Sequence, residues 1–140
     1  MPAYTKINLS PDGTEGDGDP IKITDTSGNG TFIHDTLISK RRKDEVWLWV
    51  TNTSAAPVEV TMHVGYLSTA AAAVDQRSIF TVPPKSGWML VLPGQPLKGN
   101  GTTARRIAAY AGSANVINVM GYVNRISASA ATRDNLADPS

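Results

Sequence analysis

Alternation of apolar and polar residues is the main pattern in this chain. Residues 58–64 place valine or methionine at every second position, with Glu59, Thr61 and His63 between them. Residues 45–51 (EVWLWVT) combine this alternation with β-branched and aromatic side chains. Such side chains suit a half-buried, pleated surface better than a helix. The two segments therefore predict strands, and the short connection at 54–57 predicts that they pair as an antiparallel hairpin.

Similar runs predict further strands near residues 7–9, 21–24, 31–38, 79–82, 106–111 and 116–126. Residues 88–92 (WMLVL) are apolar on both faces and lie between glycine and proline, which predicts a central strand. Turn signals separate these runs at the spacing typical of a sandwich or barrel. No segment predicts a helix long enough to support a parallel α/β sheet. We expect an all-β fold with a single antiparallel β-sandwich.

The domain organisation follows from where apolar residues are scarce. At 140 residues the chain has the length of one domain. Residues 10–19 are almost all glycine, aspartate, proline or small polar residues, which predicts a mobile loop. We expect residues 1–30 to form an N-terminal arm with short strands, residues 31–126 the sandwich, and residues 127–140 a flexible tail. The alanine-rich stretch 70–74 is interpreted as a loop.

Composition and charge remove several function classes. Cysteine is absent, so disulfide scaffolds, thiolate metal sites and cysteine nucleophiles are excluded. Thirteen basic and twelve acidic residues give a net charge of +1, which offers no general attraction to nucleic acid or to a membrane surface. The first residues lack the apolar core of a secretory signal, and no run is long enough to span a bilayer. We therefore expect a soluble chain made in a cytoplasm, with neither membrane nor nucleic acid as a partner.

Residues that could carry catalysis are few. Histidine occurs only at His34 and His63, on different predicted strands, and the spacing indicates no third metal ligand. The paired histidines of a cupin-type metal site are missing. Asp and Glu alternate with Gly between residues 12 and 19, as in a calcium loop, but the bidentate glutamate position is not matched. Nucleophile-elbow and phosphate-loop motifs are also absent. We expect no enzyme activity, no cofactor and no metal.

The tryptophans indicate a possible interface. If Val46, Leu48 and Val50 face the core, Trp47 and Trp49 must point to the opposite side of their sheet. Either a second layer of the same subunit covers these indoles, or they belong to a subunit or partner interface, where tryptophan is enriched. The third tryptophan, Trp88, is included in the same candidate interface.

Four adjacent cations, Lys40, Arg41, Arg42 and Lys43, form the strongest charge feature. The simplest interpretation is a solvated turn between two strands. The functional interpretation is a contact site, and without interleaved aromatic residues an acidic protein surface fits it better than nucleic acid. These four residues complete the candidate interface.

Residues 43–126 are similar to small virion proteins of tailed bacteriophages. The similarity lies in how predicted strands alternate with Asn-Thr and proline-rich turns. Three segments carry it: VWLWVTNTS at 46–54, TVPPKSG at 81–87 and NVMGYVNRI at 118–126. The resemblance implies a jelly-roll-like subunit, commonly a homotrimer, that decorates a capsid or lies at the head-to-tail region. Its partners would be the major capsid protein or other virion proteins, and its location the virion, assembled in the host cytoplasm.

Two alternatives to a capsid decoration (cement) protein remain open. The same domain could be a neck or tail structural protein of the virion. A carbohydrate-binding module, acting as a receptor-binding appendage, belongs to a different class, and Trp88 or Tyr110 would then be expected to contact sugar.

Overall fold

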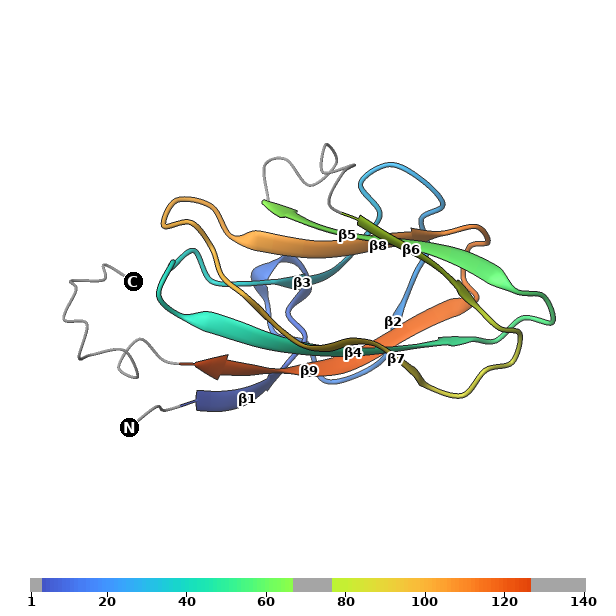
Figure 1. Ribbon diagram of the computed structural model, residues 1–140, viewed down its shortest axis with the longest axis horizontal. Helices are drawn as coiled ribbons and strands as arrows, with labels where there is room; N and C mark the ends of the chain where they lie inside the picture. The colour runs from blue at the N-terminus through green and yellow to red at the C-terminus, as the bar shows by residue number, and fades with distance from the viewer. Residues whose placement is uncertain (1–3, 67–76, 127–140) are drawn as a thin grey trace.

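The computed structural model describes residues 4–66 and 77–126. In this part of the chain, nine strands form two antiparallel sheets that pack face to face (Figure 1). The expected all-β sandwich is confirmed. The expectations for residues 70–74 and 127–140 fall outside the described residues.

Both sheets combine strands that are distant in sequence. Sheet A has the order β1 (Tyr4–Asn8), β9 (Ile117–Ile126), β4 (Lys43–Asn52) and β7 (Met89–Leu97), and the short β2 (Ile21–Lys22) also pairs with β9. Sheet B has the order β3 (Thr31–Asp35), β8 (Arg105–Ala111), β5 (Val58–Tyr66) and β6 (Arg77–Val82).

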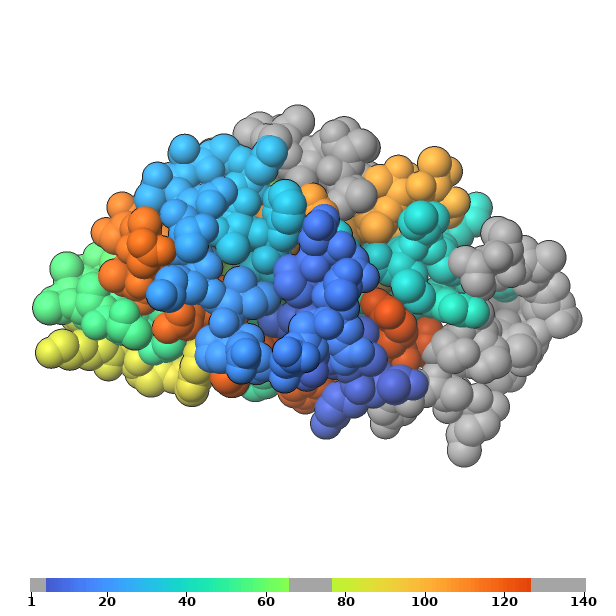
Figure 2. All heavy atoms as spheres, turned by 180° about the vertical axis from the view of Figure 1, so that it is seen from behind, coloured from blue at the N-terminus to red at the C-terminus, as the bar shows by residue number. Residues whose placement is uncertain are grey.

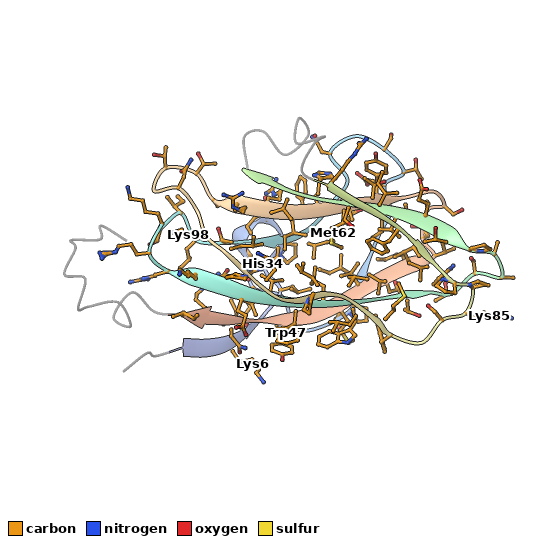
Figure 3. The ribbon with its side chains drawn as sticks, viewed as in Figure 1. Lys6, His34, Trp47, Met62, Lys85 and Lys98 are labelled. Atoms are coloured by element: carbon orange, nitrogen blue, oxygen red, sulfur yellow. The ribbon has the colours of Figure 1, made fainter. Side chains whose placement is uncertain are left out.

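The core is built from the inward-facing residues of both sheets. Val46, Leu48 and Val50 of β4 are fully buried, as the alternation predicts. From sheet B, Val60 and Met62 of β5 join the same apolar cluster, and Figure 3 shows Met62 between the two layers. Packing two apolar sheet faces against each other removes both from water, which is the main stabilisation of such a fold.

The predicted hairpin between residues 45–51 and 58–64 is wrong. β4 pairs with β7 and β9 in sheet A, whereas β5 pairs with β6 and β8 in sheet B. The connection between them therefore crosses from one sheet to the other. Buried Asn52 holds it there, because its Nδ2 donates to the carbonyls of Ala56 (2.8 Å) and Val82 (3.0 Å). Facing each other across the core lets both strands bury their apolar sides.

The predicted central strand at 88–92 is an edge strand. β7 begins at Met89 and pairs only with β4 among the described strands. Pro93 and Pro96 lie within it and have no N–H to donate, so proline confines the strand to the edge of a sheet. Trp88 precedes the strand and is 46% exposed. Met89, Val91 and Leu92 of this segment pack against the core, whereas Leu90, like Trp88, stays exposed.

N-terminal residues close one side of the sandwich. β1 pairs with β9 along its full length, and the 3₁₀ turn η1 (Pro11–Gly13) leads the chain from sheet A towards β3 of sheet B. Seen from behind, the N-terminal segments in blue lie across this side of the molecule (Figure 2). Within the described residues, the region expected as an arm thus supplies strands to sheet A.

Candidate docking face on sheet A

Two tryptophans project from the outer side of sheet A. On β4 they alternate with the buried Val46, Leu48 and Val50, and both indoles are only partly buried. Figure 3 shows Trp47 on the side of the sheet away from Met62 and the core. The predicted orientation of the two tryptophans is therefore correct, and no layer of the described chain packs over this face to bury them.

Tyr122 joins the two indoles because β9 pairs with β4 in a register that places it opposite Trp47. The ring centroids of Trp47, Trp49 and Tyr122 lie 6.1–6.3 Å apart, with interplanar angles of 12–26°. The three near-parallel rings thus mark the corners of an almost equilateral triangle, which we name the aromatic cluster. The Lys6 Nζ lies 4.6 Å from the centroid of the Tyr122 ring, a cation–π distance.

A carboxylate at one end of the aromatic cluster orients its neighbours. The Trp47 Nε1 and the Asn124 Nδ2 each donate to Glu45 Oε1 at 3.0 Å. The hydrogen bond from Asn124, followed by that from Trp47, lowers the pKa of Glu45 because both stabilise its charged form. At neutral pH the aromatic surface therefore adjoins an anion that fixes the rotamer of one indole.

Gly94, which has no side chain, leaves room for the Trp47 indole next to β7. A β carbon at Gly94 would lie 2.8 Å from the Trp47 Cζ2, and the φ of Gly94 is +74°. Gly94 lies at a register shift between β4 and β7, where Val46 pairs with Gln95 and Trp47 with Pro93. The bulge and the glycine together let the indole lie against the edge strand. Leu90, which pairs with Trp49 and is 44% exposed, extends the apolar surface.

The other residues of the predicted interface lie at the two ends of β4. Lys40, Arg41 and Arg42 lie in the turn before β4, whose backbone is held by hydrogen bonds from Arg41 N and Arg42 N to Ser39 Oγ. Lys43 is the first residue of the strand, on the same side as Trp47 by alternation.

Trp88 lies near the opposite end of β4. Its neighbour Met89 pairs with Val50, and Ser86 is hydrogen-bonded to Thr51 and Asn52. The structure thus joins Trp47 and Trp49 to each other, and it separates the basic turn from Trp88 by the length of the strand.

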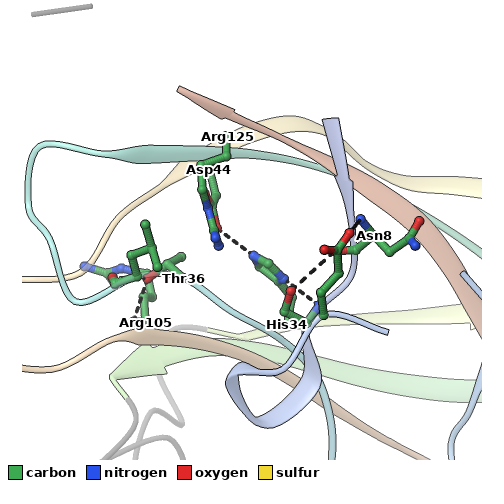
Figure 4. Close-up of polar contacts among 9 residues, drawn as sticks. Asn8, His34, Thr36, Asp44, Arg105 and Arg125 are labelled. Atoms are coloured by element: carbon green, nitrogen blue, oxygen red, sulfur yellow. Dashed lines mark hydrogen bonds and ion pairs between the residues drawn. The ribbon is translucent and has the colours of Figure 1, made fainter. Parts of the chain in front are cut away.

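A second group with catalytic residue types lies between the sheets (Figure 4). His34 Nε2 is 2.7 Å from Asp44 Oδ2, and Arg125 donates to both Asp44 oxygens at 2.8 and 2.9 Å. The Ser10 N–H donates to His34 Nδ1 at 3.0 Å, which makes Nε2 the protonated nitrogen of neutral His34.

This group cannot act on a substrate as it stands. His34 is fully buried, Asp44 is 1% exposed, and both imidazole nitrogens are occupied. The ion pair and the imidazole instead connect β4 and β9 of sheet A to β3 of sheet B and to the N-terminal segment.

The acidic loop and the second histidine do not join this group. Asp12 makes an ion pair with Arg106 at 3.1 Å, and Glu15 accepts a hydrogen bond from Asn8 N. His63 lies on β5, where burial lowers its pKa. Across residues 4–66 and 77–126, no three side chains of the types that ligate metals converge.

Comparison of the chain with protein-family models, curated proteins and solved structures found no match. In the described part of the chain, no helix has the length and apolar character needed to cross a bilayer.

Sequence reasoning missed Tyr122, Lys6, Glu45 and Gly94 as parts of this face. Residues 118–124 do alternate between outward and inward positions, so the outward direction of Tyr122 was readable. Its position opposite Trp47 depends on the β4–β9 register, which no local pattern reports.

Proposed function

We propose that this protein is a non-enzymatic structural subunit of a tailed-phage virion, a decoration (cement) protein that binds the head and stabilises it. The observation that carries the proposal is the aromatic cluster on the outer side of sheet A, whose inner side already packs against the core. Large aromatic side chains are enriched at the centres of protein interfaces. The resemblance of residues 43–126 to virion proteins gives the class of partner.

Association through a sheet face agrees with the chemistry of the neighbouring edge. Pro93 and Pro96 deprive β7 of two N–H donors, so this edge is a poor template for adding another strand. The aromatic cluster beside it is partly exposed and apolar, with Glu45 and Lys6 at its border. A face of this kind fits a flat apolar patch on another subunit or on the major capsid protein. A jelly-roll-like topology and a homotrimer belong to the same proposal.

The test mixes the purified protein with capsids that lack it. The double variant W47T/W49T introduces β-branched threonines, which suit a strand, and removes two of the three rings. We expect unaltered protein to co-sediment with capsids and raise their heat resistance, and the double variant to bind at least tenfold more weakly, since hot-spot tryptophans often contribute about 2 kcal/mol or more.

The matched control is Ile79→Thr, which removes an apolar side chain that is 53% exposed on sheet B. It should bind like the unaltered protein. Failure of the unaltered protein to bind capsids, or equal binding by W47T/W49T, would contradict the proposal. Association with isolated tails but not with heads would assign the same domain to the neck or tail.

A carbohydrate-binding module is the second candidate, because the structure places Glu45 and Asn124 beside the aromatic cluster. Stacked rings next to polar side chains suit the apolar face and the hydroxyl groups of a sugar. Tyr110 does not belong to this site, since it lies on sheet B against His63 at a centroid distance of 6.5 Å. Binding on a glycan array that W47T/W49T abolishes would favour this candidate, and an array without binding would exclude it.

A further inference from the structure

A cavity of about 850 Å³ opens at the end of the sandwich that carries the basic turn. Its walls come from η1 and from the β3–β4 and β7–β8 connections, and Leu37, Ile38 and Ala104 make much of the lining apolar. Ile38 is 51% exposed and adds to the apolar lining of this cavity.

Arg42 supplies this cavity with an unused cationic donor. Its Nε is buried and has no hydrogen-bond partner within the described residues. The nearby carboxylate of Asp35 is already occupied by two hydrogen bonds from Arg106, at 2.8 and 2.9 Å, and Asp12 also pairs with Arg106. A buried donor left unpaired is costly, so a carboxylate brought in from elsewhere would stabilise this end of the fold.

The cavity therefore suits a polypeptide segment that carries an apolar side chain between carboxylates. Residues 134–138 of this chain read Asp-Asn-Leu-Ala-Asp. β9 ends at Ile126, which pairs with Lys43, the residue next to Arg42. The eight residues from 126 to 134 reach at most about 28 Å when extended, which is ample for a cavity beside the end of the strand.

We propose that the cavity binds residues 134–138 of the same chain, with Leu136 against the apolar lining and Asp134 or Asp138 on Arg42. The exposed Lys40 and Lys43 add positive charge at the mouth of the cavity. This proposal is independent of the virion role, because it rests on the cavity, on an Arg42 Nε without a partner in residues 4–66 and 77–126, and on charge complementarity.

The absence of cysteine makes a disulfide trap unambiguous. In the full chain, T103C/A137C places one thiol on the cavity wall and one on the segment, and it leaves Leu136 in place. The control T81C/A137C places the first thiol on exposed Thr81 of β6, at the end of the sandwich near the β4–β5 connection. Mild oxidation should close a disulfide within single chains of T103C/A137C at least tenfold faster than in the control, as measured by thiol loss and non-reducing electrophoresis.

Two further variants test the recognition itself. Added to T103C/A137C, either R42Q or D134N/D138N should slow closure about fivefold, and high salt should slow it similarly. R42Q removes a side chain whose Nε has no partner among the described residues, so circular dichroism should show an intact fold. Equal closure rates in T103C/A137C and its control, or no effect of R42Q, would overturn the proposal. Cross-links formed only between chains would overturn the same-chain assignment in favour of a second copy.

Discussion

Replacing Asp44 by asparagine should greatly lower the free energy of unfolding although it hardly changes the shape of the side chain. It is 1% exposed and accepts two hydrogen bonds from Arg125 and one from His34. In D44N the amide keeps the volume but loses the charge, and its NH₂ group faces other donors. Breaking a buried pair by removing one partner costs about 3–5 kcal/mol. Since the Arg125 side chain is 24% exposed and water screens it, we expect about 3 kcal/mol, a decrease in Tm of about 10 °C.

The same substitution should change the response to acid. Burial opposes ionisation of Asp44, but the hydrogen bonds from Arg125 and His34 outweigh it and lower the pKa of the carboxyl. A carboxyl whose pKa is lowered by folding contributes stability that is complete above its unfolded pKa of about 4, and this stability is lost as pH falls towards the folded pKa. The unaltered protein should therefore lose stability below about pH 5, and D44N should lose less over that range.

The assay is urea unfolding between pH 7 and pH 3, followed by tryptophan fluorescence. Asp17→Asn is the matched control, since the Asp17 side chain is exposed. It should unfold like the unaltered protein at every pH. A loss below about 1 kcal/mol in D44N at pH 7, together with an unchanged acid dependence, would refute the view that this buried ion pair stabilises the sandwich.

Two further substitutions, each paired with a control substitution, test the packing by thermal unfolding. Leu48→Ala removes a fully buried side chain and should cost about 2–5 kcal/mol, whereas Ile79→Ala, at a position that is 53% exposed, should change stability by less than about 0.5 kcal/mol. Gly121→Ala should prevent folding or lower Tm by more than about 10 °C, because its β carbon would overlap the backbone carbonyl oxygen of Trp47. Gly87→Ala, with no atom within 4 Å of the new methyl group, should fold normally, and comparable losses in the two glycine variants would contradict the proposed close contact.

Sequence patterns predicted the direction of side chains better than the partners of strands. Alternation in residues 45–51 correctly assigned Leu48 to the core and Trp47 to the outside, because a strand exposes its two faces in turn whatever it pairs with. The prediction that β4 and β5 form a hairpin is wrong because alternation does not depend on the strand's partner. Two strands with one apolar face each satisfy burial equally well side by side or across the core. The hydrogen bonds from Asn52 to Ala56 and Val82 stabilise the crossing connection, and alternation does not report them.

The anchoring of the N-terminal segment was also invisible in the sequence. Residues 10–19 are poor in apolar side chains, so their composition predicted a mobile loop. The structure holds their start through single polar contacts: Ser10 N–H to His34 Nδ1, and Asp12 to Arg106. The partners in the first contact are 24 positions apart in the sequence, and those in the second are 94 apart. The composition of a short window carries no information about such contacts.

The aromatic cluster allows a role in folding to be distinguished from the proposed role in docking. The core is formed by the inner faces of the two sheets. The outward rings of Trp47 and Trp49 therefore stabilise the isolated chain chiefly through contacts with each other and with Tyr122. Aromatic pairs contribute about 0.5–1.5 kcal/mol each beyond area burial, which limits this share to a few kcal/mol. If the rings served folding alone, W47T/W49T would lower Tm and leave partner binding per folded molecule unchanged. If they form a docking face, binding falls at least tenfold at temperatures where the variant is fully folded, and that comparison decides between the two roles.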